Sequence, residues 1–447
     1  MKAFISKPVI FFLVIILQAL TGSSADFYVS PNGNNSNPGA REKPFATIER
    51  AKQAAEIHFK QNPNKNCTIW LDRGKHNILK PVVFSSDSLK NQTGQLFFKA
   101  IPGENPIVSG GIEITEWQKT SAGLWKAKLP KSYKNENTPR ELFIENQRAI
   151  RARFPNEEYL RVSKVGDDRR THFFFKPGDF PIPENEKTVE LVLLHDWSIT
   201  RIPVKKINRE ENELTAVDSI GAKSPEFFNL DHWEANPRYY LENAMEFLDA
   251  DYEWFYHSDE NNIYLKLPEN ENPNEMEINI PVSEGLVLMK GTENQLLKNI
   301  HFEGITFRHS AWQIPESGYC GVQACHFDPR PEYGGWAVVP AAVQGEWIQN
   351  CTFSNCRFEN LGGSGIWLGT GSQKCTISKS YFTDISGNGI MIGEGQDREV
   401  NGEKWWQSSP EQVALGNTVE NCTVTDCGKQ FYGAVGIWCG LTAETTI

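Results

Sequence analysis

The sequence predicts an all-β fold built as a parallel β-helix, a solenoid in which each turn of the chain is one coil. The first observation is a repeat: segments that begin at Thr352, Thr376 and Thr418 align without gaps. The second is a short glycine-bounded strand after each copy, at residues 365–369, 389–393 and 436–440. A period in the twenties with glycine or asparagine at fixed turns is typical of solenoids. The segment lacks the helical periodicity of leucine-rich or ankyrin arrays.

The spacing of the copies predicts how the coils stack. The first two copies are offset by 24 residues, and the next offset of 42 contains an insertion after Gly393. Alternation within a strand directs Cys356 and Phe358 into the core and Arg357 and Glu359 outward. The other two copies repeat that choice, so equivalent strands are expected to pair from coil to coil.

The remaining chain divides into four expected parts. Residues 1–25 hold an apolar run after Lys2 and Lys7, a pattern typical of a signal peptide, with cleavage expected after Ala25. The pattern predicts a secreted protein, extracellular or periplasmic, without a membrane span. Residues 26–111 are expected to hold the first coils and an N-terminal capping helix at 45–59. Residues 112–285 break the repeat and carry the hairpin signal at 253–266, which indicates an inserted antiparallel β domain. Residues 286–447 form the main β-helix.

Composition excludes some partners. The 447 residues hold 45 Lys and Arg against 56 Asp and Glu, a net charge of −11, which argues against a nucleic-acid partner. Aromatic residues reach 11 %, with 13 Trp, which is typical of β-rich proteins that handle carbohydrate. None of the nine cysteines lies in a CxxC or His/Cys cluster, so no metal cofactor is expected. A disulfide between Cys351 and Cys375, one coil apart, stays open.

One column of the repeat carries the candidate chemistry. Superposition places His309, Asn360, Asp384 and Asp426 in line, and adjacent strands lie about 4.8 Å apart. Asp384 and Asp426 are therefore expected to be neighbours. The two catalytic carboxyls of glycosidases lie about 5–9.5 Å apart. One of the pair would donate a proton and the other would act as a charged base or nucleophile. The alternative is that the column is an internal side-chain ladder that caps turns.

Other residues are candidates for sugar contact or for replacement of the pair. If Asp384 points inward, the substitutes are Glu394, Asp397 and Glu399. The candidate substrate-binding residues share rings, amides or carboxylates near the column or on the loop before it, and they are Tyr319, His326, Trp336, Trp367, Trp438, His309, Asn360 and Glu394. The same rings would otherwise only pack the loops. Four arginines at 140, 148, 151 and 153 would suit an acidic sugar, but a solvated strand face is favoured for them.

Several motifs together resemble a known family. They are residues 27–33 with 43–48, residues 140–146 with 151–156, the Glu253-Trp-Phe-Tyr hairpin and Gly318-Tyr-Cys-Gly-Val-Gln323. The sequence is similar to glycoside hydrolase family 141, which includes fucosidase and xylanase activities. The resemblance implies a right-handed β-helix with an Asp pair on this face, and it implies further coils, so truncation at the C-terminal end is expected.

Three functions are kept open. The leading expectation is a secreted glycoside hydrolase that degrades a polysaccharide or oligosaccharide with Asp384 and Asp426 and no cofactor. The first alternative is a polysaccharide lyase on the same fold, with Ca²⁺ and a Lys or Arg base acting on uronic acids. The second is a non-catalytic carbohydrate-binding solenoid.

Overall fold

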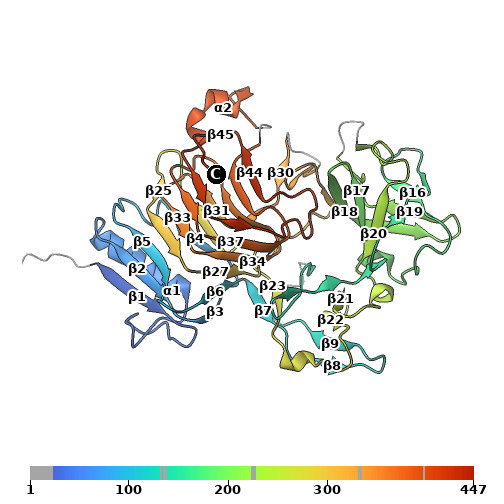
Figure 1. Ribbon diagram of the computed structural model, residues 1–447, viewed down its shortest axis with the longest axis horizontal. Coiled ribbons are helices and arrows are strands. Elements are labelled where there is room, and N and C mark those ends of the chain that lie inside the picture. Colours follow the sequence, from blue (N-terminus) through green and yellow to red (C-terminus); the bar gives the residue numbers. More distant parts are fainter. Residues whose placement is uncertain (1–23, 131–132, 134–137, 223–227, 331–334, 396–397) are drawn as a thin grey trace, which may run out of the picture.

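The computed structural model describes residues 24–130, 133, 138–222, 228–330, 335–395 and 398–447. Three parallel sheets run along a solenoid, and antiparallel sheets form a body beside it (Figure 1). The prediction of an all-β parallel β-helix with an inserted antiparallel domain is therefore confirmed. The predicted signal peptide lies almost entirely outside the described residues and stays a prediction. No helix among the described residues is long and apolar enough to cross a membrane.

Each solenoid sheet takes one strand from each coil. The first sheet runs β1 (Ala25–Val29), β2 (Cys67–Leu71), β5 (Leu96–Ala100), β26 (Ile300–Glu303), β33 (Thr352–Ser354), β36 (Thr376–Ser378) and β42 (Thr418–Glu420). The second runs β3 (Gly74–Asn77), β6 (Pro106–Ser109), β27 (Thr306–Arg308), β34 (Arg357–Leu361), β37 (Tyr381–Ile385) and β43 (Thr423–Val424). The third runs β4 (Val82–Ser85), β24 (Val287–Lys290), β31 (Ala341–Glu346), β35 (Ser364–Leu368), β38 (Ile390–Gly393) and β44 (Ile437–Gly440).

The register of these sheets is the one that the repeat predicts. Thr352 pairs with Thr376 and Thr376 with Thr418, while Phe358 pairs with Phe382. The two phenylalanine rings stack at 4.6 Å between centroids, inside the solenoid. Stacking of equivalent apolar residues in every coil buries one continuous core, which a single coil cannot do alone.

A helix covers one side of the first coils. The helix α1 spans Ile48–Gln61, begins later than the predicted 45–59, and packs against β1 and β2. Phe45 stays extended because its amide donates to the Tyr28 carbonyl at 2.8 Å, and the Thr47 hydroxyl caps the first turn. Residues Ala51, Ala55 and Phe59 face the core.

The inserted body leaves the solenoid after β6 and returns before β24. One of its sheets joins β7 (Gly111–Glu113), β10 (Phe143–Ile144), β11 (Gln147–Arg148) and β23 (Ile278–Pro281). A second sheet joins β8 (Gln118–Lys119), β9 (Trp125–Lys128), β12 (Ile150–Arg151), β21 (Glu253–His257) and β22 (Asn262–Leu265). The largest sheet joins β13 (Arg153–Phe154), β14 (Leu160–Arg161), β15 (Lys164–Val165), β16 (His172–Phe174), β17 (Glu190–His195), β18 (Ser198–Asn208), β19 (Glu213–Ala216), β20 (Arg238–Glu242) and β28 (Tyr319–Cys320). The predicted hairpin is β21 and β22, paired antiparallel.

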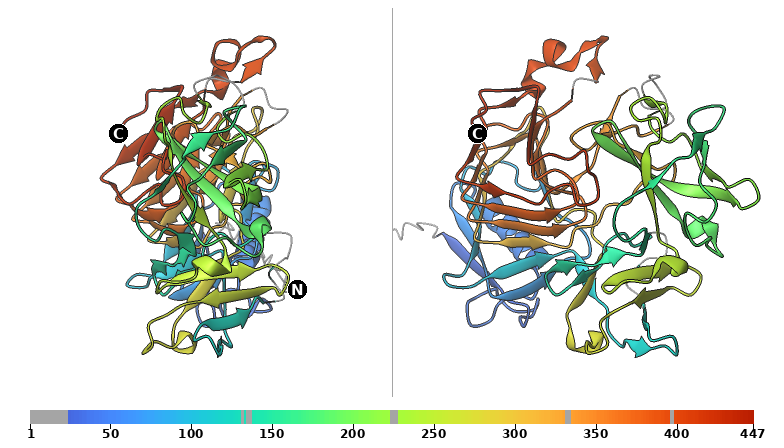
Figure 2. Two further views of the ribbon diagram at one scale, coloured as in Figure 1. Left: turned by 90° about the vertical axis from the view of Figure 1, so that its right-hand side faces the viewer. Right: turned by 45° about the vertical axis from the view of Figure 1, so that its right-hand side comes forward.

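Loops between coils complete the molecule. The excursion after β27 contains β28 and the pair β29 (His326–Phe327) and β30 (Ala337–Val338), and it joins the inserted body through β28 and β18. The later insertion holds β39 (Glu399–Val400), β40 (Glu403–Lys404) and α2 (Trp405–Ser408). Short edges are β25 (Leu297–Lys298) with β32 (Ile348–Gln349) and β41 (Ala414–Leu415) with β45 (Thr442–Ala443), and the 3₁₀ turns are η1 (Glu186–Thr188), η3 (Met245–Phe247), η4 (Pro273–Glu275) and η5 (Pro410–Gln412). Figure 2 shows the inserted body alongside the solenoid.

The cysteines lie mostly in the solenoid core. All nine are free thiols, and Cys351 and Cys375 are buried on adjacent coils. A hydrogen bond from the Cys375 thiol lowers the pKa of Cys351. The structure therefore places the two thiols side by side, as the shared column predicts, without a bond between them.

Candidate active site

A left-handed residue turns the corner of each coil at the predicted column. The backbone φ angles are 59° at His309, 54° at Asn360, 48° at Asp384 and 52° at Asp426. Asparagine and aspartate tolerate this conformation better than other non-glycine residues. The bend breaks the strict alternation of the strand, so the next residue (Leu361 in one coil) can return to the core while the corner side chain faces away from it.

The corner opens into a cavity between the solenoid and the inserted body. The cavity has a volume of about 410 Å³, and both Asp384 and Asp426 line it. The two residues belong to neighbouring coils, because Tyr381 pairs with Thr423 and the Ile385 amide donates to the Asp426 carbonyl at 3.2 Å. The structure thus brings the predicted pair to one wall. The other lining residues come mainly from the inserted body and are Asn146, Gln147, Arg148, Ala149, Ile150, Arg151, Arg153, Arg201, Tyr240, Glu242, Lys429, Gln430 and Tyr432.

Both carboxyl oxygens of Asp384 accept hydrogen bonds from nitrogen donors. Arg148 Nε donates to Oδ1 at 2.8 Å and Asn360 Nδ2 donates to Oδ2 at 2.7 Å. Asn360 and Asp384 are therefore joined side chain to side chain across adjacent coils, and Asp384 also lines the cavity. Each carboxyl oxygen of Asp384 is therefore engaged by a donor, one from the inserted body and one from the preceding coil.

Arg148 connects the inserted body to the solenoid. Only 9 % of its side chain is exposed, and it pairs with Glu141 as well as Asp384. It also donates to the Leu361 carbonyl at 3.0 Å and the Ser386 hydroxyl at 3.0 Å. Burial by itself lowers the pKa of Arg148, but the two carboxylates outweigh it and raise that pKa.

Asp426 is much more open than Asp384. Half of its side chain is exposed (50 %), and its Oδ1 accepts from Lys429 Nζ at 3.0 Å. Its Oδ2 makes no hydrogen bond among the described residues. The two acids of the pair thus differ in exposure and in hydrogen bonding, which is the kind of asymmetry that separates a proton donor from a charged partner.

A buried ionic network lies beneath the cavity, and its members Arg151, Arg201 and Glu242 form the floor. Arg201 Nη1 donates to Glu190 at 2.9 Å and to Glu242 at 2.8 Å, and Arg140 grips Glu190 through two bonds of 2.7 Å. Burial alone would raise the pKa of Glu190, but Arg140, Arg151 and Arg201 hold it well below its ordinary value. Glu242 is 5 % exposed, so it supports the floor rather than offering an open carboxylate.

Two tyrosines line the cavity, and Tyr432 is exposed whereas Tyr240 is almost fully buried beside Arg153. Burial raises the pKa of Tyr240 well above its ordinary value, so the phenol is neutral. Its hydroxyl lies 2.9 Å from that of Tyr432, whose side chain is exposed, and it accepts from Arg201 Nη2 at 3.2 Å. Flat rings with a polar edge suit the faces and hydroxyls of sugars. Sequence reasoning missed both tyrosines, and neither lies in a repeated position.

Four predicted contacts lie on another face of the solenoid. Trp367 and Trp438 lie on the third sheet, one on each side of Met391, as the repeat predicts, but neither tryptophan lines this cavity. The His326 ring lies 4.8 Å from the Trp438 ring. Glu394 is ion-paired to Arg398 at 3.0 Å.

The remaining predicted contacts are buried or lie apart. Tyr319 is fully buried in the cluster around β18, and His309 is 2 % exposed against the Phe143 ring. Burial lowers the pKa of His309 to about 3. Neither side chain is open to a sugar in this structure. Trp336 is half-buried before β30 and does not line the cavity.

The residues predicted to replace Asp384 if it pointed inward are not needed, because Asp384 lines the cavity. Glu399 pairs with Lys404 at 3.5 Å, and Asp397 lies outside the described residues. Among the described residues, no group of three or more His, Cys, Asp or Glu side chains is arranged to hold a metal ion.

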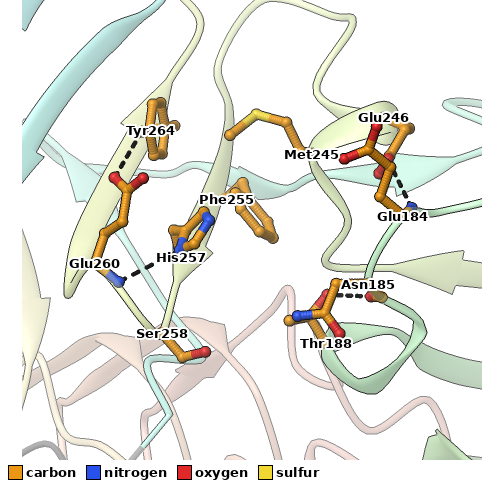
Figure 3. A pocket seen from close by; sticks show the side chains of 10 residues that line it. All are labelled: Glu184, Asn185, Thr188, Met245, Glu246, Phe255, His257, Ser258, Glu260 and Tyr264. Atoms are coloured by element: carbon orange, nitrogen blue, oxygen red, sulfur yellow. Dashed lines mark hydrogen bonds between the residues drawn. The ribbon is translucent and has the colours of Figure 1, made fainter.

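A second cavity lies wholly within the inserted body. Figure 3 shows Phe255, His257 and Tyr264 on one side of this space of about 430 Å³, with Glu246 on the other. The Glu246 carboxylate accepts a hydrogen bond from the Glu184 backbone amide at 2.8 Å. Hydrogen bonds from Lys126, Asn262 and Tyr264 lower the pKa of Glu260 to about 2. A proton donor with a facing carboxylate is therefore better supplied by the cavity at Asp384.

Comparison with known proteins matches both parts of the chain. Residues 122–268 match the model "GH141 insertion domain", and residues 277–404 and 349–447 match "Right handed beta helix region". These matches confirm the predicted resemblance and the hand of the solenoid. No curated protein matches the sequence.

Solved structures are similar to this chain to different degrees. One titled "Glycoside hydrolase" has a TM-score of 0.81 and 23 % identity, over 94 % of this chain and 76 % of that chain. Another, "The complex structure of XylC with xylose", has a TM-score of 0.43 and 14 % identity, over 93 % of this chain and 56 % of that one. The insertion-domain match supports a glycoside hydrolase, and the first of these structures shows a shared fold.

Proposed function

We propose that this protein, which carries the insertion domain of glycoside hydrolase family 141 on a right-handed parallel β-helix, hydrolyses O-glycosidic bonds with Asp384 and Asp426. The observation that carries the proposal is their position on consecutive coils, at one wall of one cavity. Two carboxyls flanking the scissile bond are what most glycosidases require.

The surroundings of the two acids divide the roles between them. Asp384 acts as the charged carboxylate, a nucleophile or a base toward water, because Arg148 and Asn360 occupy both of its oxygens. Asp426 donates the proton to the leaving oxygen, because its Oδ2 is open and the side chain is half exposed. Tyr432, which lines the cavity with an exposed side chain, would then contact the sugar ring and its hydroxyls.

The proposed substrate is a complex polysaccharide or an oligosaccharide derived from one. The cavity is bounded by the solenoid on one side and by β11, β12 and β20 on the other, so it would enclose one end or a short stretch of a glycan. We further propose that the protein is secreted, since residues 1–25 have the pattern of a signal peptide.

The experiment separates the two roles by leaving-group chemistry. Wild type, Asp384→Asn and Asp426→Asn are assayed on polysaccharides and on aryl glycosides with good and poor leaving groups. Asp426→Asn is expected to retain activity only on the activated glycosides, which need no proton, whereas Asp384→Asn loses both. Glu303→Gln, a carboxylate that is 51 % exposed on β26, is the matched control and keeps wild-type rates.

Two results would overturn the proposal. An unsaturated, ultraviolet-absorbing product would show that the enzyme is a lyase. Binding of glycans that survives both Asn variants, with no turnover by wild type on any substrate, would show a non-catalytic solenoid.

A further inference from the structure

The basic side chains of the cavity at Asp384 have acidic partners, with one exception. Among the described residues, each of the others lies within 4.0 Å of a carboxylate. The pairs are Arg148 with Glu141 and Asp384, Arg151 with Glu190 and Glu242, Arg201 with Glu190 and Glu242, and Lys429 with Asp426. The exception is Arg153, which lines the same cavity from β13.

The guanidinium of Arg153 is held in place but not neutralised. Its Nε donates to the Pro155 carbonyl at 2.9 Å and its Nη2 to the Glu158 carbonyl at 3.3 Å. Its Cζ lies 3.9 Å from the centre of the Tyr240 ring. The Glu253 carboxylate accepts from the backbone amide of Arg153, at 3.2 Å, and forms no ion pair with its guanidinium among the described residues. Three of the five guanidinium N–H donors therefore have no partner in the described part of the chain.

The charge balance of the whole site leaves the same surplus. Six cations, the four above with Arg140 and Arg153, face five carboxylates: Glu141, Glu190, Glu242, Asp384 and Asp426. Protonation of Asp426, as the proposed mechanism requires, raises the surplus to two positive charges. Arg153 is only half-buried, so water can solvate its unused donors, and a ligand carboxylate that replaces this water would supply the missing negative charge.

We propose that the cavity binds an anionic sugar and that Arg153 grips its carboxylate, so the substrate is a glycan that contains uronic acid. The inference rests on the proposed function of this cavity and names its substrate class. A planar guanidinium with unused donors matches a carboxylate through two parallel hydrogen bonds, which an ammonium cannot make. The Tyr240 ring packs against this guanidinium.

The test compares one polysaccharide before and after its carboxyl groups are reduced to primary alcohols. Wild type is expected to cleave the native uronic-acid form at least ~10-fold faster, in kcat/KM, than the reduced form. Arg153→Met is expected to lower kcat/KM on the native form ~10- to 100-fold and to change the reduced form by less than ~3-fold. Arg153→Lys recovers only part of the loss because it lacks the fork.

Controls separate sugar recognition from folding. Arg161→Met removes the same charge from the neighbouring strand β14, where the side chain is 49 % exposed and pairs with Glu234. It is expected to behave as wild type on both polymers. Circular dichroism melting of Arg153→Met checks that the variant is folded.

A binding measurement makes the outcome independent of turnover. Calorimetry with Asp384→Asn and free galacturonic or glucuronic acid, against galactose or glucose, is expected to show binding of the acids that Arg153→Met abolishes. Such binding without hydrolysis by wild type would keep the inference and refute the proposed function. Equal loss on both polymers, no preference of wild type, or preference for a sulfated over a carboxylated glycan would overturn the inference.

Discussion

Replacement of Arg148 by Met is expected to destabilise the protein strongly. The guanidinium is 9 % exposed and joins Glu141, on the inserted body, to Asp384, on the solenoid. Its removal leaves two poorly exposed carboxylates (5 % and 15 %) without their cation and takes one hydrogen bond from each of the Leu361 and Asp384 carbonyls. Loss of one partner from a buried ion pair costs about 3–5 kcal/mol of unfolding free energy.

Urea unfolding followed by tryptophan fluorescence measures this change. Arg73→Met is the matched control, because Arg73 is also paired with a glutamate, Glu104, but is 77 % exposed, and it is expected to lose less than about 1 kcal/mol. Adding Glu141→Gln to Arg148→Met is expected to restore about 1–2 kcal/mol, since it removes one stranded charge. If Arg148→Met loses no more stability than Arg73→Met, the reasoning about this cation is refuted.

Three further predictions concern the corner column and its surroundings. His309 has a folded pKa of about 3, below its ordinary 6.5, so only the unfolded chain binds the proton between these values and stability falls as pH drops below 6.5. Urea unfolding at pH 7 and 5 is expected to show about 2 kcal/mol less pH-dependent loss in His309→Asn than in wild type, and an equal loss would contradict this. Asn360→Ala removes the donor to Asp384 and is expected to lower kcat/KM by ~10-fold or more in glycoside assays, with unchanged rates counting against the assigned contact. In Gly389→Ala the new Cβ would lie 2.5 Å from the Gly436 carbonyl, costing about 1–3 kcal/mol in unfolding, whereas Gly436→Ala, with its nearest neighbour at 3.4 Å, is expected to be tolerated; equal effects would refute the packing argument.

The solenoid part of the site could be predicted from the sequence because the period fixes which residues pair. Once Thr376 and Thr418 are aligned, Asp384 and Asp426 must occupy the same corner of adjacent coils. The direction of that corner was harder to predict. Strict alternation sends it inward, and only the left-handed backbone at these residues turns it toward the cavity.

The inserted half of the site could not be predicted, because no period relates it to the coils. Arg148 and Arg151 were expected on a solvated strand face, yet they are buried by carboxylates that lie far away in the sequence. The prediction that Tyr319 contacts a sugar is wrong for a similar reason. It sits in a long loop without a repeat, and the loop adds a strand to β18 and buries the ring.

The corner conformation also couples backbone preference to reactivity. The residue types that best tolerate the left-handed bend, asparagine and aspartate, are the ones whose amides and carboxylates can act on a glycan. A coil that needs this bend therefore tends to present a reactive group there without disturbing the hydrophobic interior. Asn360 and Asp384 show that an amide and an acid are interchangeable at the bend. Descendants of such a scaffold can acquire or lose an enzymatic group by a single codon change while the architecture persists.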